Sequence, residues 1–266
     1  MTVRVLSYYP GCSLHGMSRE YDESTRLVYR ALGIELRELA NWTCCGASAG
    51  HSLDQELAIA LATRNLELAA AAGNELVAPC AACYQRLKIG EKESASPVTV
   101  LHALDVISSP ETLDRLRESL QRPLSGLKIV LYYGCLLVRP PEVTGREDYE
   151  DPQSMDQVMA AVGADIRPWS FKTDCCGAGL AVARPDVVRR LSSHLAEMAR
   201  QAGADCIVTA CPLCQANLDT RQDKGGLPVL YFTELLACAL GLEGTESWWR
   251  RHMVDPVPVL KKAGVI

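Results

Sequence analysis

Ten of the 12 cysteines in this chain repeat one spacing twice, and this duplication limits the folds that the chain can adopt. Each set has a single cysteine, then an adjacent pair followed by glycine, then a C-x-x-C motif. The gap from the pair to C-x-x-C is 34 residues in both sets, and the gap from the single cysteine to the pair is 31 residues in one and 39 in the other. The first set is Cys12, Cys44, Cys45, Cys80 and Cys83, and the second is Cys135, Cys175, Cys176, Cys211 and Cys214. Because a repeat fixes the architecture, we expect two copies of one structural unit.

The pattern around the cysteines predicts strands that alternate with helices in both halves. Short apolar runs at 4–8 and 128–133 predict buried parallel strands. The remaining expected elements are helices at 19–32 and 154–162, extended pieces at 34–39 and 165–169, helices at 53–72 and 186–202 closed by glycine, strands at 75–78 and 206–209, and segments at 98–107 and 229–240 that begin as strands and turn helical. This order predicts an α/β fold of two pseudo-twofold-related domains, each a small, mainly parallel sheet flanked by helices.

The domain limits follow from the same pattern. We place the first domain at residues 1–115 and the second at 126–266, with a linker within 108–125 where prolines flank a charged helical stretch. Each cysteine motif falls just past the carboxyl end of an expected strand. Open α/β sheets place their sites at that edge.

Composition and charge narrow the class of protein. A hydrophobic fraction of 48% and a charged fraction of 22% are typical of a globular protein with buried cores. The net charge of −5 argues against a basic surface that binds nucleic acid. The first residues lack the features of a signal peptide, and the most apolar run, 227–242, is too short to span a bilayer. We therefore expect a cytoplasmic protein without membrane insertion, whose thiols stay reduced and serve metal binding or redox chemistry.

Five cysteines in each half exceed the needs of one metal ion. Four thiolates saturate a structural zinc or an ordinary [4Fe–4S] cluster, and two adjacent cysteines cannot easily face one tetrahedral ion. The glycine after each pair lets the backbone approach closely, so that N–H groups can point at sulfur. A C-x-x-C motif at the start of a helix places its thiolates where the helix dipole favours negative charge. Each half is thus suited to an anionic, thiolate-rich inorganic centre.

Other interpretations of the cysteines remain open. C-x-x-C motifs also occur in thioredoxin-type redox pairs and zinc ribbons. Zinc in both halves, zinc in one half with iron in the other, or one Cys₄ zinc site shared by the two C-x-x-C motifs are the alternatives, although the last leaves the adjacent pairs unexplained. A reducing compartment argues against disulfides. Cys206 and Cys238 lie in apolar segments, and we expect them to be buried hydrophobic residues.

The duplicated cysteine set resembles a known family over nearly the whole chain. The matching segments are the two Cys-Cys-Gly motifs, the Tyr-Pro-Gly opening before Cys12, residues 133–140, the loop at 149–152, and residues 100–102 and 229–231. Together they resemble the B subunit of heterodisulfide reductase and related proteins with paired CCG domains, including subunits of sulfur-oxidising complexes. In that family each CCG unit holds a non-cubane [4Fe–4S] cluster through its five cysteines, and a disulfide substrate binds between the two clusters.

The resemblance implies a function and a set of partners. Each cysteine set would hold one cluster, and the chain would be the catalytic, disulfide-cleaving or disulfide-forming subunit of a larger complex. The implied partners are an iron–sulfur C subunit (HdrC-like) and a flavoprotein A subunit (HdrA-like), and the implied substrate is a disulfide, lipoate-bound sulfur or persulfide sulfur. Nothing in the residues selects the direction of the reaction. The alternatives are an electron-transfer CCG subunit of a lactate, glycolate or succinate oxidoreductase, and a zinc-stabilised scaffold.

Three further features could contribute to a site. His15 and His51 follow Cys12 and Cys45 closely and could donate a proton or a hydrogen bond to sulfur, or serve in packing. The aromatic and basic segment at 248–252 suits partner docking or packing against the second domain. The long loop at 142–155 could shape the cluster rim or cover a substrate.

Overall fold

The chain consists of two halves of the same design in a computed structural model that describes residues 3–47, 50–73, 75–223 and 225–266. The elements of the first half are β1 (Arg4–Tyr8), α1 (Gly11–His15), α2 (Arg19–Ala31), β2 (Ile34–Glu38), α3 (Gly50–Leu53), α4 (Gln55–Ala72), β3 (Glu75–Ala78), α5 (Ala81–Glu93), β4 (Thr99–His102), α6 (Ala103–Ile107) and α7 (Pro110–Glu118). The elements of the second half are β5 (Lys128–Tyr132), α8 (Pro141–Thr144), α9 (Ser154–Ala161), β6 (Asp165–Ile166), α10 (Pro185–Gln201), β7 (Cys206–Thr209), α11 (Pro212–Arg221), β8 (Val229–Tyr231), α12 (Phe232–Ala239) and α13 (Val257–Lys262), with the 3₁₀ turns η1 (Ala178–Leu180), η2 (Thr245–Ser247) and η3 (Trp249–Arg251).

Each half is built on a four-stranded sheet in which all paired strands are parallel. The strand orders are β2-β1-β3-β4 and β6-β5-β7-β8, so the two sheets share one topology. The first strand of each half lies between the second and the third. The chain therefore adds the second strand on one side of the first and the third strand on the other side. Open α/β sheets bind ligands at the carboxyl ends of the strands where the order changes direction in this way. The predicted α/β fold with two related, mainly parallel sheets is confirmed.

The long helices begin and end where the sequence indicates. The Asp54 carboxylate caps α4 by accepting a hydrogen bond from the Leu57 N–H at 3.0 Å. Gly73 caps the end of the same helix, and Gly203 follows α10 with a φ of +76°. These ends direct the chain into β3 and β7, the strands that lead to the two C-x-x-C motifs.

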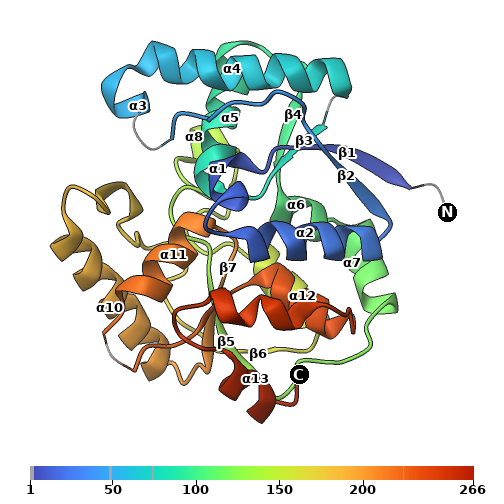
Figure 1. The fold of residues 1–266 in the computed structure, drawn as a ribbon, viewed down its shortest axis with the longest axis vertical. Helices are drawn as coiled ribbons and strands as arrows, with labels where there is room; N and C mark the ends of the chain where they lie inside the picture. The colour runs from blue at the N-terminus through green and yellow to red at the C-terminus, as the bar shows by residue number, and fades with distance from the viewer. Residues whose placement is uncertain (1–2, 48–49, 74, 224) are drawn as a thin grey trace.

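The two halves meet through α2 and α12, which run side by side between the two sheets (Figure 1). The Tyr21 and Tyr231 rings stack across this boundary with their centroids 4.1 Å apart. The Ser24 and Thr233 hydroxyls share a buried hydrogen bond of 2.7 Å. Buried residues of both halves belong to one continuous hydrophobic core. The halves therefore hold each other in a defined position.

The C-terminal segment also ties the halves together. Trp248 and Trp249 are buried, and the Trp248 indole donates a 2.9 Å hydrogen bond to Glu23 on α2. Arg251 forms an ion pair with the same carboxylate at 3.0 Å. Of the two roles expected for residues 248–252, the structure supports packing, and the contact extends to the first half as well as the second.

Some elements differ from the sequence expectation. The extended piece expected at 165–169 is a strand only as far as Ile166, because Pro168 has no N–H to donate to a ladder. The helix expected from residue 53 begins at Gln55, after the separate turn α3. Between the halves, α7 crosses residue 115 and buries Leu113 and Leu116. The limits 1–115 and 126–266 stay predictions.

Among the helices that the structure describes, none combines the length and the apolar character needed to cross a membrane.

Candidate metal centre

The cysteines of each half gather at the carboxyl edge of its sheet. In the first half, Cys12 follows β1, the adjacent pair follows β2, and C-x-x-C follows β3; the second half repeats this after β5, β6 and β7. The Cys45 and Cys83 sulfurs are 3.2 Å apart. The equivalent sulfurs of Cys176 and Cys214 are 3.7 Å apart. The fold thus brings together cysteines that lie far apart in the sequence, in the same way twice.

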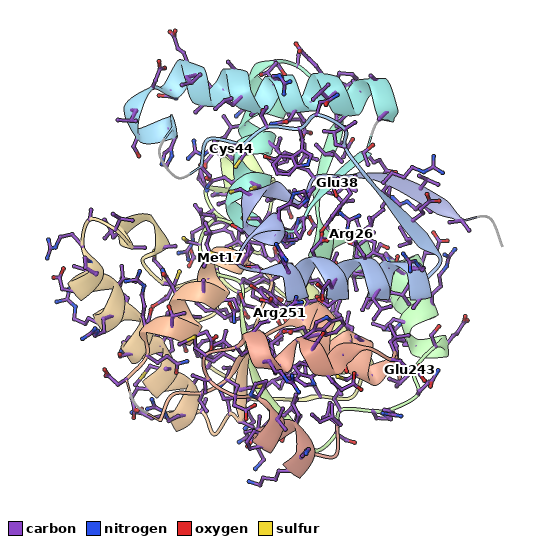
Figure 2. The ribbon with its side chains drawn as sticks, viewed as in Figure 1. Met17, Arg26, Glu38, Cys44, Glu243 and Arg251 are labelled. Atoms are coloured by element: carbon purple, nitrogen blue, oxygen red, sulfur yellow. The ribbon has the colours of Figure 1, made fainter. Side chains whose placement is uncertain are left out.

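Each cysteine set has a buried floor and an open edge. Cys12, Cys44 and Cys175 are exposed, and Cys135 is partly exposed. The other six are buried: Cys45, Cys80, Cys83, Cys176, Cys211 and Cys214. Figure 2 labels Cys44 in the upper half, with the exposed Met17 below it near the boundary between the halves. A group held by either set would therefore be partly buried and reachable from solvent.

Glycine before the first cysteine makes room for the last one. A Cβ on Gly11 would lie 3.0 Å from the Cys83 sulfur, and a Cβ on Gly134 would lie 2.9 Å from the Cys214 sulfur. Both glycines also have a positive φ, +70° and +68°, which disfavours other residues. A side chain at either position would crowd this sulfur and require it to shift.

Backbone N–H groups point at sulfur in both Cys-Cys-Gly turns. The Gly46 N–H donates to the Cys44 sulfur at 3.4 Å, and the Gly177 N–H donates to the Cys175 sulfur at 3.3 Å. The two glycines adopt φ values of +77° and +82°. The prediction that glycine lets N–H groups face sulfur is confirmed in both halves. Such donors stabilise thiolate charge and tune the potential of a bound cluster.

Buried side chains fix the residue before each adjacent pair. The Tyr9 hydroxyl donates to the Thr43 carbonyl at 2.6 Å, and the Tyr132 hydroxyl donates to the Asp174 carbonyl at 2.5 Å. In the first half, the buried Asn65 side chain accepts from the Thr43 N–H at 2.9 Å and donates to its carbonyl at 3.1 Å. These contacts hold the approach to the cysteine pairs in place before any metal binds.

Contacts among the thiols favour thiolates. Hydrogen bonds from the Cys44 and Cys83 thiols lower the pKa of Cys45 to about 3. In the second half, a hydrogen bond from Cys135 lowers the pKa of Cys175 to about 6. The pKa of Cys135 is raised in return, mainly by its contact with Cys175. Thiolate is the form that binds metal, so each set has at least one member ready to act as a ligand.

The two C-x-x-C motifs are neighbours at the boundary between the halves. Contact with Cys211 raises the pKa of Cys80, whereas the Cys214 and then the Cys80 thiol lower the pKa of Cys211. The buried Tyr21 hydroxyl lies 3.2 Å from the Pro79 carbonyl and 3.1 Å from the Ala210 carbonyl. These carbonyls belong to the residues directly before Cys80 and Cys211. Tyr21 therefore links the two motifs.

The donor set fits an iron–sulfur centre. The thiols of each set lie together at the strand ends, with glycine clearance and N–H donors aimed at sulfur. Thiolates are the ligands of iron–sulfur clusters, and the five in each set exceed the four that one metal ion takes.

The histidines flagged in the sequence lie at the edge of the first set. The His15 Nε2 lies 3.0 Å from the Glu38 carboxylate, and the ring packs edge-on against Trp42. Glu38 also accepts hydrogen bonds from Arg26 and Trp42, and Figure 2 labels Arg26 and Glu38 close to one another. His51 is exposed on α3. The structure gives His15 a packing partner, and a role in proton transfer for either residue stays a prediction.

The remaining predicted features find clear positions. Cys206 and Cys238 are buried, as expected. The long loop of the second half contains α8, which packs against α5, the helix that carries Cys83. The Gln85 amide donates to the Arg139 carbonyl at 2.8 Å, and Tyr84 donates to the Thr144 carbonyl at 3.4 Å. The start of this loop thus supports the first cysteine set, and a role in covering a substrate stays a prediction.

Sequence reasoning missed three residues. Tyr21 and Asn65 act on backbone groups far away in the sequence, and no local pattern marks them. Arg86 lies three residues after Cys83. Since residues three apart share a helix face, that spacing could have singled out Arg86 before the structure was known.

Comparisons with known proteins agree with this geometry. The model of the CCG cysteine-rich domain family matches twice, over residues 6–88 and 129–219. The chain is 29% identical over 278 residues to the 8-methylmenaquinol:fumarate reductase membrane anchor subunit of Wolinella succinogenes, covering 94% of this chain and 96% of that protein. It is 28% identical over 290 residues to the B subunit of the ferredoxin:CoB-CoM heterodisulfide reductase of Methanosarcina mazei, covering 97% and 96%.

The solved structures show a shared fold. A hypothetical protein from Helicobacter pylori superposes with a TM-score of 0.74 at 13% identity, covering 94% of this chain and 52% of that one. The two ranges matched by the domain model cover more than half of the present chain. The chain belongs to the CCG cysteine-rich domain family, carries two copies of that domain, and is a relative of the heterodisulfide reductase B subunit.

Proposed function

We propose that this chain is the catalytic iron–sulfur subunit of a heterodisulfide reductase-type complex, and that each half holds one non-cubane [4Fe–4S] cluster. The ligands of the first cluster are Cys12, Cys44, Cys45, Cys80 and Cys83, and those of the second are Cys135, Cys175, Cys176, Cys211 and Cys214. One observation carries the proposal. The two sets adjoin at Cys80 and Cys211, and both open to solvent through exposed thiols. In this proposal, a disulfide substrate binds between the two sets.

The reaction is the interconversion of a disulfide and two thiols, which takes up or releases two electrons and two protons. Two bound clusters would supply or accept these electrons one at a time. The residues of the chain prepare the site. The buried cysteines exclude water from its floor, Gly11 and Gly134 admit the last cysteine of each set, and the Gly46 and Gly177 N–H groups stabilise charge on sulfur.

The proposed partners are an iron–sulfur C-type subunit and a flavoprotein A-type subunit, which would carry electrons to or from this chain. The relatives support an assembly, because they are named as subunits of reductase complexes. The proposed substrate class is a disulfide, lipoate-bound sulfur or persulfide sulfur. Cys12 and Cys44 in the first set and Cys175 in the second are exposed, so a sulfur compound in solution can contact each set.

A second candidate is electron transfer without disulfide chemistry. It is favoured by the relative in Wolinella succinogenes, which is named as a subunit of a fumarate reductase and matches nearly the full chain. In that case the two clusters would relay electrons to another subunit, and no disulfide would react.

Turnover separates the two candidates. Anaerobically purified protein with full iron content is mixed with reduced benzyl viologen and either CoB-CoM heterodisulfide or lipoamide, and release of thiols is measured. Cys44→Ser and Cys175→Ser should each abolish thiol release, whereas the matched variant Cys238→Ser, outside both sets, should retain it. Electron transfer through the assembled complex without any disulfide reaction would support the second candidate, electron transfer alone.

A further inference from the structure

The two cysteine sets are alike in their ligands but unlike in the charges beside them. The third residue after the last cysteine is Arg86 on α5 in the first half and Asn217 on α11 in the second. Both positions share a helix face with that cysteine. The Asn217 amide lies 3.4 Å from the Cys176 carbonyl and 3.8 Å from the Cys176 sulfur. The equivalent position in the first half is Arg86.

Arg86 brings a positive charge to the first set. Its side chain is partly buried, and Cys83 on the same face contacts Cys45 at 3.2 Å. Burial lowers the pKa of Arg86, and the Cys45 thiolate opposes that shift. Among the ion pairs formed by the described residues, none involves Arg86, so its charge is available to the cysteine set.

The residue directly before each adjacent pair adds to the difference. It is Thr43 in the first half and Asp174 in the second. Asp174 is exposed, and its negative charge acts on Cys175. Beside Thr43 lies a further cation, because Arg64 donates to the Thr43 hydroxyl at 3.4 Å and to the Asn41 carbonyl at 3.1 Å.

A cation near the second set does not offset this difference. Arg139 reaches the Thr173 hydroxyl at 3.1 Å, but it forms an ion pair with Glu150 at 2.5 Å. The carboxylate cancels most of its charge at a distance. Arg86 and Asp174 thus make the first set more positive and the second more negative.

We propose that this inequality orders the two clusters: the cluster in the first half has the higher reduction potential and accepts an electron before the cluster in the second half. Reduction adds one negative charge to a cluster. A nearby guanidinium stabilises that charge and a nearby carboxylate opposes it. The inference rests on the proposed iron–sulfur function. It assigns different reduction potentials to two clusters whose ligand sets are the same.

Exchange of residues between the halves tests the proposal. Wild type, Arg86→Asn and Asp174→Thr are titrated anaerobically with dithionite while the EPR signals of both clusters are recorded. Each substitution installs the residue of the other half. We expect two midpoints in wild type. Arg86→Asn should lower the higher midpoint by at least a tenfold change in the reduction equilibrium, about 59 mV for one electron, and leave the lower one in place. Asp174→Thr should raise the lower midpoint and leave the higher one in place.

Controls make the result specific. Arg86→Lys keeps the charge and should keep the wild-type midpoints, and Lys92→Asn removes an exposed charge further along α5 and should also change neither. The inference would be overturned if the two midpoints coincide in wild type. It would also be overturned if Arg86→Asn shifts the lower of the two midpoints. If Arg86→Asn loses iron, the test depends on Asp174→Thr. An unchanged lower midpoint in Asp174→Thr then overturns the proposal. Iron far below about eight atoms in wild type would instead contradict the proposed function.

Discussion

Tyr21 of the first half and Tyr231 of the second stack face to face, with ring centroids 4.1 Å apart and planes inclined by only 1°. The Tyr21 hydroxyl lies within hydrogen-bonding distance of the carbonyls that precede both C-x-x-C motifs, at Pro79 and Ala210. One buried side chain therefore joins the packing between the halves to the spacing of the two cysteine sets. The distance between the proposed clusters is fixed by the core of the protein.

Removal of the Tyr21 hydroxyl should weaken both the fold and the metal centre. Tyr21→Phe leaves the Ala210 carbonyl without its partner, which costs about 1–3 kcal/mol. The Pro79 carbonyl keeps its 2.8 Å contact with the His102 Nε2. We expect a lower free energy of unfolding in urea and faster loss of iron to a chelator. Tyr29→Phe is the control, because the Tyr29 hydroxyl donates to the Ala103 carbonyl within the first half. It should lose similar stability but release iron at the wild-type rate. Equal release rates in the two variants would contradict this role of Tyr21.

The glycines before the first cysteines should be needed for metal binding. In Gly11→Ala or Gly134→Ala, the new Cβ would approach the sulfur of Cys83 or Cys214 to about 3 Å. We expect each variant to fold and to lose the cluster of its own half, so that iron falls from about eight to about four atoms per chain.

Gly145→Ala is the matched control for these variants. Gly145 has a φ of +70°, the same as that of Gly11, but a Cβ there would meet nothing within 4 Å. The control carries the same backbone strain without contact with a cysteine and should keep its iron. Equal loss of iron in Gly11→Ala and Gly145→Ala would show that backbone strain, and not the sulfur contact, is responsible.

The sequence predicted the fold well where the information is local. The short apolar runs predict the strands, and the order of the cysteines places each motif at a strand end. Parallel strands bring these ends to one edge of the sheet. The glycine turns at Gly46 and Gly177 were predictable because close N–H approach to sulfur needs a residue without Cβ. The stacking of Tyr21 on Tyr231 was not, because it depends on how the halves associate. The charge difference between Arg86 and Asp174 can be read from the aligned halves of the sequence, but the contacts of the surrounding side chains cannot.

The buried His252–Glu234 pair should make stability depend on pH. The His252 Nε2 and the Glu234 carboxylate are 2.9 Å apart, and both side chains are almost fully buried. Burial acts to lower the pKa of His252, but the Glu234 charge and hydrogen bond raise it to about 9. The unfolded value is about 6.5. The protonated pair therefore contributes stability that is fully present below about pH 6.5 and is lost as pH rises through about 9.

Comparison with His252→Gln measures this contribution. The difference between the two pKa values corresponds to about 3 kcal/mol. The free energy of unfolding of wild type minus that of the variant should be larger at pH 6 than at pH 10, by about this amount. Titrations common to both proteins, including those of the cysteines, cancel in the difference. A difference that is constant over this range would contradict the assignment of a charged His252.

The central claim is that each half holds one iron–sulfur cluster through its own five cysteines. Iron and acid-labile sulfide per chain, measured on anaerobically purified wild type, Cys44→Ser and Cys175→Ser, test it most directly. The account predicts about eight irons with matching sulfide in wild type, the sum for two four-iron clusters, and about four in each variant. Zinc without iron or sulfide in wild type, from cells with intact cluster assembly, would contradict the account and leave a zinc-stabilised scaffold.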